Sequence, residues 1–208
     1  LGGGCEIVLH SDHVQAHVET YIGLTEAALG ICPAWGGCKE MLTKFASDKI
    51  LPKGPMPSII KAFETIGMAK TSSSAHEARE LGYLSDTDDI TMNKDRLLFD
   101  AKVKALELIS DYKPPEKITF RLPGKTAYTA MKLAVDSMLL SGQISCHDQM
   151  VGEQIAIILS GGDTDITEEI DEDQMLKLER AAIQKLFREK LTLDRLEHLL
   201  ETGKILRN

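Results

Sequence analysis

Strand-like sequence is confined to a few short pieces near the start of this 208-residue chain, and this most constrains its fold. Residues 14–16 and 20–23 have the β-branched and aromatic content that favours strands. From residue 56 onward the pattern is almost wholly helical. A layered α/β fold cannot close with so few strands. We therefore expect the remaining strands upstream of residue 1, so that this sequence is a piece of a longer protein.

The first residues point the same way. The chain opens Leu1-Gly2-Gly3-Gly4 without an initiator methionine, an unusual natural start. The glycines lead into a short predicted helix that begins near Glu6 and ends near residues 12–13. A loop is predicted over residues 30–37 and a helix over residues 38–45.

Capping signals and apolar stripes define the later helices. Ser74 and Glu77 form a predicted capping box, and Ser145 with Asp148 starts another helix. Residues 116–123 read as an extended connector after two prolines. The apolar stripes, which we expect to be core or interface, are Leu98, Ala101, Ala105 and Leu108, then Met175, Leu178, Ala182 and Leu186.

Composition excludes several classes of protein. The net charge of −8 argues against a nucleic-acid partner, which requires a basic face. No apolar run reaches the roughly 18 residues of a membrane span, and no signal peptide is visible. The four cysteines, which form no C-x2-C pattern, read as free thiols in a reducing compartment. The expected location is therefore the cytoplasm.

Two glutamates, Glu6 and Glu26, stand in a glycine-rich frame. Taken singly, each reads as a solvated carboxylate, Glu6 at a helix N-terminus and Glu26 on the surface. Together, two carboxyl groups can share the proton transfers of adding water to a double bond next to a thioester. Backbone N–H groups in a glycine turn can meet the negative charge that develops on the thioester oxygen. The pair and its frame favour this acid/base interpretation.

The segment Leu1-Gly2-Gly3-Gly4-Cys5-Glu6 resembles the Gly-Gly-Gly-x-Glu segment of the crotonase (enoyl-CoA hydratase/isomerase) family, and Asp12 and Ala16 also fit its pattern. Tyr21-Ile22-Gly23-Leu24-Thr25-Glu26 resembles the family's aromatic-x-x-Pro-Glu stretch, although Thr25 replaces the usual proline. Residues 29–37 resemble the loop that follows.

This resemblance implies that Glu6 and Glu26 are the catalytic glutamates of a hydratase acting on acyl-CoA thioesters. It also implies that the Gly3 N–H is an oxyanion donor and that Gly4 belongs to the same substrate-binding turn. The second oxyanion donor of the family comes from an earlier loop that this sequence lacks. We therefore expect the 208 residues alone to be inactive.

A narrower resemblance extends over the rest of the chain. Residues 66–75, 89–95 and 199–204 are similar to the C-terminal end of bacterial 3-hydroxyacyl-CoA dehydrogenases with a fused hydratase module. It implies an α/β crotonase-like fragment, mostly helical. Residues 1–90 would be the C-terminal part of the crotonase domain and residues 91–208 a helical extension. The chain lacks a Gly-x-Gly-x-x-Gly motif, so NAD is expected only in an N-terminal part of the parent protein.

Other sites are weaker. Glu6, His10, His13 and His17 have zinc-like spacing, but they would need an unbroken helix through residue 17, so no metal is expected. The acidic stretch over residues 163–173 lacks the glycine and glutamate of an EF-hand and reads as helix capping. Trp35 reads as loop packing.

The leading interpretation is an enoyl-CoA hydratase module of fatty-acid β-oxidation. The alternative is a helical interaction or oligomerisation module without activity of its own, built from the amphipathic helices of residues 90–208. Self-association, or packing on the dehydrogenase domain, is expected to cover exposed apolar edges.

Overall fold

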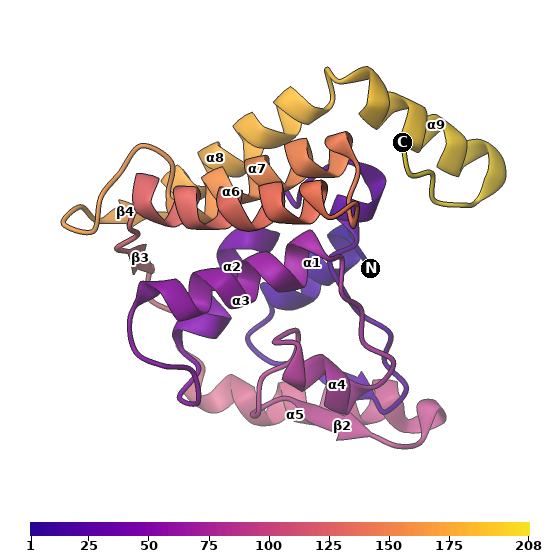
Figure 1. The fold of residues 1–208 in the computed structure, drawn as a ribbon. Coiled ribbons are helices and arrows are strands. Elements are labelled where there is room, and N and C mark those ends of the chain that lie inside the picture. Colours follow the sequence, from indigo (N-terminus) through magenta and orange to yellow (C-terminus); the bar gives the residue numbers. More distant parts are fainter.

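The computed structural model describes residues 1–208 as helices arranged in tiers with very little sheet (Figure 1). The α-helices are α1 (Gly3–Leu9), α2 (Gly37–Ala46), α3 (Pro55–Gly67), α4 (Ala75–Glu80), α5 (Leu97–Leu108), α6 (Lys125–Leu140), α7 (Cys146–Ser160), α8 (Glu172–Leu186) and α9 (Lys190–Thr202). The strands are β1 (Gln15–His17), β2 (Asp89–Thr91), β3 (Thr119–Phe120) and β4 (Ile170–Asp171). Short 3-10 helices are η1 (Glu26–Leu29), η2 (Lys94–Arg96) and η3 (Ile109–Asp111).

One hydrophobic core joins the N-terminal segment to the later helices. It contains buried side chains from α1, α2, α3, α7 and α8, among them Cys5, Met41, Ile59, Ile158 and Met175. In Figure 1, α6, α7 and α8 lie above α1, α2 and α3, while α4, α5 and β2 form the lowest tier. No helix is both long enough and apolar enough to cross a lipid bilayer.

The sheet is as small as the sequence predicts. β1 pairs in parallel with β2, with Ala16 opposite Ile90, and β3 pairs antiparallel with β4. The strand expected over residues 20–23 is absent. There Thr20 folds back through its hydroxyl onto the carbonyl of His17, and only Gly23 forms an isolated bridge, to Thr71.

The predicted starts of α4 and α7 are confirmed by their caps, whereas the first helix runs from Gly3 to Leu9 and not from near Glu6 to residues 12–13. Ser145 and Asp148 form the reciprocal capping box at the start of α7, and Asp171 caps α8 in the same way. At α4, Ser74 accepts the Glu77 amide as predicted, but the Glu77 carboxylate turns back to Ser73 instead.

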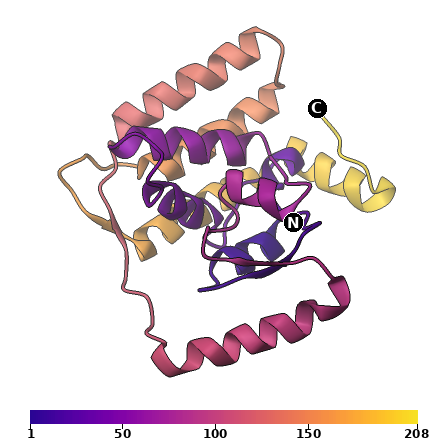
Figure 2. The same ribbon diagram turned by 90° about the horizontal axis from the view of Figure 1, so that it is seen from below.

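The apolar stripe of helix α5, expected to be core or interface, is not part of the core. The helix spans almost the predicted residues, yet none of its side chains is buried, and Leu98 is 82% exposed. Figure 2 shows α5 standing apart from the main body, at the end of the extended segment that leads to α6. Polar contacts attach it, including a 2.8 Å ion pair from Lys104 to Asp89 and a 2.9 Å bond between Thr91 and Asp100.

Candidate active site

The glycine turn at the start of α1 has the backbone that the sequence requires. Gly2 adopts a left-handed φ of +57°, which disfavours residues with a side chain, and its N–H donates to the carbonyl of Gly23 at 2.9 Å. This bond ties the turn to the segment that leads into Glu26. The helix then places Glu6 in its first turn, on the same buried face as Cys5 and Leu9.

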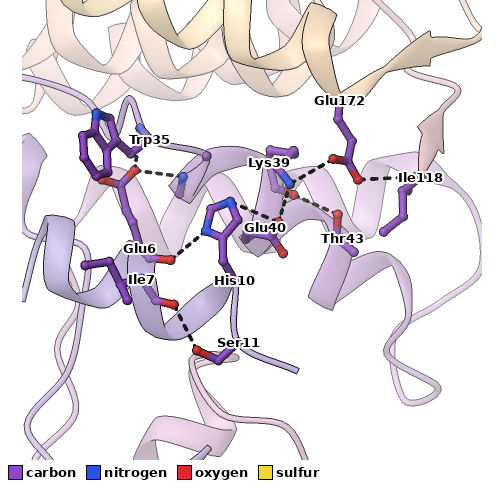
Figure 3. A network of polar contacts seen from close by, with 12 residues as sticks. Glu6, Ile7, His10, Ser11, Trp35, Lys39, Glu40, Thr43, Ile118 and Glu172 are labelled. Carbon is purple, nitrogen blue, oxygen red and sulfur yellow. Dashed lines mark hydrogen bonds and ion pairs between the residues drawn. The ribbon is translucent and has the colours of Figure 1, made fainter. Parts of the chain in front are cut away.

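Glu6 is a buried carboxylate, not a solvated one. Its side chain is 5% exposed, and its Oε1 accepts hydrogen bonds from the amides of Trp35 (2.8 Å) and Gly37 (2.9 Å) (Figure 3). Two N–H donors to one oxygen stabilise the charged form of a carboxylate. Its Oε2 accepts no hydrogen bond within the chain.

Glu26 begins η1 and is 8% exposed, so it is not a surface carboxylate either. Its Oε2 is buried without a hydrogen-bond partner, which is uncommon in proteins and costly. Burial raises the pKa of Glu26 to about 7, and the negative charge of Glu6 adds to the rise. A carboxyl group with this pKa can exchange a proton near neutral pH.

The two carboxylates meet at the glycine turn. A Cβ placed on Gly2 would lie 3.3 Å from Oε1 of Glu26, and one placed on Gly3 would lie 3.9 Å from Oε2 of Glu6. The structure therefore brings together the two glutamates that the sequence singled out. The two glutamates are twenty residues apart in the sequence. The chain runs from α1 through β1, and the Gly2–Gly23 hydrogen bond then brings the segment before Glu26 next to the start of α1.

The amides of the glycine turn are not equivalent. The Gly4 N–H donates to the carbonyl of Leu1 at 3.2 Å. The Gly3 N–H, at the first position of α1, has no acceptor within the chain. A free N–H at a helix start, beside two carboxyl groups, is a suitable donor for an oxyanion.

A third buried carboxylate, Glu179 of α8, was not predicted as a site residue. It has no exposed surface, and its oxygens accept from the amides of Gly36 (2.7 Å) and Lys39 (3.0 Å). Burial raises its pKa to about 7. The sequence does contain a signal: residue 179 lies on the buried face of α8, four residues after Met175 and three before Ala182, where an apolar side chain is expected.

Nearby thiols are poor nucleophiles. Burial raises the pKa of Cys5 and of Cys32 to about 12 and raises the pKa of Cys38 well above its ordinary value. At neutral pH these side chains are neutral thiols that fill the core around the carboxylates.

The remaining site candidates separate in space. Helix α1 ends at Leu9, so His13 and His17 do not continue its face; His13 pairs instead with Asp89 at 3.3 Å. No three side chains of the metal-binding types gather closely enough to hold an ion. The expected packing role of Trp35 is wrong: its side chain is 73% exposed, and only its backbone amide serves the site.

Known structures share this fold. A carnitinyl-CoA hydratase from Mycobacterium avium superposes with a TM-score of 0.55, at 14% sequence identity, over 99% of this chain and 57% of its own. A carnitinyl-CoA dehydratase from Mycobacterium avium 104 gives a TM-score of 0.50, at 17% identity, over 92% of this chain and 54% of its own. The chain has the crotonase fold. The expected fold class, crotonase-like and mostly helical, is thus confirmed.

The sequence relatives of this chain are longer proteins. A protein of Bacillus subtilis (strain 168) named probable 3-hydroxyacyl-CoA dehydrogenase is 42% identical over 211 residues, which is all of this chain and 26% of that protein. A protein of Rickettsia felis named "Putative fatty acid oxidation complex trifunctional enzyme" is 34% identical over 120 residues, which are 57% of this chain and 15% of that protein. The chain thus spans about a quarter or less of these curated relatives. No family model matches it.

Proposed function

We propose that Glu6 and Glu26 are the acid/base pair of a 2-enoyl-CoA hydratase site, within a polypeptide that also has 3-hydroxyacyl-CoA dehydrogenase activity. One observation carries the proposal: two buried carboxylates converge on a glycine turn with a free N–H, and the Oε2 atom of each accepts no hydrogen bond within the chain. Buried unpaired carboxylates destabilise a fold, so their presence is better explained by chemistry than by packing.

The two glutamates have different environments, which assign a different proton transfer to each. The Oε1 of Glu6 is held by two amides, and its free Oε2 can take a proton from water. The water oxygen then bonds to C3 of the enoyl group as the C2–C3 double bond opens toward the thioester carbonyl. Glu26, with a pKa near 7, delivers a proton to C2. Proton exchange with solvent restores both groups.

The Gly3 N–H is the donor assigned to the thioester oxygen, which carries enolate charge during the addition. Gly4 leaves space for the substrate at the start of α1. A Cβ at this position would meet no atom within 4 Å. One donor of this kind contributes roughly 3 kcal/mol to lowering a barrier. The reaction needs no cofactor, and NAD would serve only the dehydrogenase part of the polypeptide.

Isotope labelling in the complete natural protein tests the reaction. A short 2-enoyl-CoA is incubated in D2O or in H2(18)O, and loss of the conjugated thioester absorbance is followed. The proposal predicts one deuterium at C2 and one 18O at C3 of the product.

The alternative, a helical interaction module, makes a different prediction. It requires the complete protein to leave 2-enoyl-CoA unchanged under all conditions in which the fold is intact. Absence of turnover by folded protein would therefore contradict the proposed function and favour the module.

A further inference from the structure

The backbone amides of the loop at Trp35–Gly37 donate hydrogen bonds to two buried carboxylates beside α2. The amides alternate in direction: those of Trp35 and Gly37 donate to Glu6, while that of Gly36 donates to Glu179. Lys39, in the first turn of α2, adds a second amide to Glu179. Two carboxylates from helices far apart in sequence thus clamp one loop from two sides.

The loop supplies no side-chain cap of its own to the start of α2. Gly36 caps α2 in a left-handed conformation (φ +93°) and has no side chain with which to cap the helix. The Trp35 ring is exposed and anchors nothing. Glycine pairs are conformationally permissive, so the loop's geometry depends on the acceptors that the protein supplies to its amides.

Capping α2 with the fully buried carboxylate of Glu179 costs free energy of desolvation. Glu179 lies on the apolar face of α8, where a methionine or leucine would pack at lower cost. Exposed acceptors from a nearby loop could cap α2 without that penalty. The free-energy cost of burying Glu179 is therefore explained by a further role of the loop, whose other amides donate to Glu6.

We propose that Glu179 is a positioning residue for Glu6: by holding the Gly36 and Lys39 amides, it aims the Trp35 and Gly37 amides at Oε1 of Glu6 and leaves Oε2 free for water. This inference rests on the proposed function. It extends the active site to α8, more than 150 residues beyond the glutamate pair in the sequence. Misplacement of a catalytic group by about 1 Å costs on the order of 100-fold in rate.

The test compares Glu179→Gln, Glu179→Asp and a matched control in the complete natural protein. The control is Glu172→Gln, at an acidic residue of the same helix that pairs with Lys39 Nζ at 3.6 Å but accepts no amide of the loop. Glu179→Gln replaces one amide acceptor by an NH2 group, so kcat should fall about 10- to 100-fold with KM changed less than about threefold. Glu179→Asp, too short to hold both amides, should also lower kcat. Glu172→Gln should stay within about twofold of wild type.

A double variant separates positioning from a general loss of stability. If Glu179 acts through Glu6, then Glu179→Gln should cost less than about threefold in kcat when Glu6 is already glutamine. Equal losses in both backgrounds would overturn the inference, as would a Glu179→Gln protein with normal kcat. If Glu179→Gln does not fold, Glu179→Asp is judged by the same two criteria. Full activity of both Glu6→Gln and Glu26→Gln would instead refute the proposed function itself.

Discussion

Thr192 donates a 2.9 Å hydrogen bond to the carbonyl oxygen of Gly30, a residue 162 positions earlier in the chain. Gly30 is the left-handed C-cap of η1, the short helix that Glu26 begins. The Thr192 hydroxyl also lies 2.9 Å from Nε2 of His147, and all three groups are buried. The last helix, α9, is therefore part of the structure that holds Glu26 in place.

Thr192→Val should destabilise the protein by about 1–3 kcal/mol. The substitution keeps the shape but leaves the Gly30 carbonyl and the His147 ring without their shared partner. Urea denaturation measures the change, with Thr192→Ser, which keeps the hydroxyl, as the control. A valine variant as stable as wild type would show that this bond contributes nothing.

Arg195→Met should cost about 3 kcal/mol of stability or more. The guanidinium is 1% exposed and binds Asp148 at 2.8 Å and the side chain of Asn208 at 2.8 Å, so its loss leaves a partly buried carboxylate unpaired. Arg96→Met is the matched control, because its ion pair to Asp100 is largely exposed and should matter by less than about 0.5 kcal/mol. Equal melting temperatures for the two variants would contradict this ranking.

Glu26→Gln should stabilise the protein, and only at higher pH. The folded pKa of Glu26, about 7 against an ordinary 4.5, means that the folded state binds the proton more tightly than the unfolded state. The free energy of unfolding therefore falls as pH rises from 4.5 to 7, by up to about 3 kcal/mol. Glutamine cannot ionise and avoids this loss.

Denaturation at pH 5 and pH 8 checks the sign. The Glu26→Gln protein should match wild type at pH 5 and exceed it at pH 8, while Glu19→Gln, at an exposed position, should show no such difference. Parallel stability curves for wild type and Glu26→Gln would mean that Glu26 is not held in a desolvated environment.

Gly37→Ala should displace Glu6. A Cβ at Gly37 would lie 2.8 Å from Oε1 of Glu6 and 2.8 Å from Cβ of Pro33, so one of these groups must move. We expect a loss of about 1–3 kcal/mol in stability and a lower kcat. Gly67→Ala, where a Cβ meets nothing within 4 Å, should change neither. Normal activity of Gly37→Ala would show that the position of Glu6 tolerates the shift.

Local patterns in the sequence predict much of this structure. The caps at Ser145 and Asp148, the short helix holding Glu6 and the small sheet all depend on neighbours a few residues apart. The stripe at Leu98 predicts a helix but not its surroundings, because periodicity reports that a face is apolar and says nothing of what covers it. The burial of Glu6 and Glu26 follows only from tertiary contacts.

Long-range polar contacts account for the rest. Glu179 and Thr192 act on loops about 140 and 160 residues away, and no spacing rule links such positions. Their only trace in the sequence is a polar residue at a place where the helical period expects an apolar one. Trp35 shows the reverse: its residue type suggested packing, whereas only its backbone is used.

The turnover of 2-enoyl-CoA by Glu6→Gln and Glu26→Gln, each in the complete natural protein, tests the central claim most directly. Removing a general acid or base lowers the rate by roughly 100- to 10,000-fold. We predict a kcat reduced by at least about 100-fold in each variant, with the fold intact and with Glu19→Gln unchanged. If both variants turn over substrate at the wild-type rate, the two buried glutamates are not the acid/base pair.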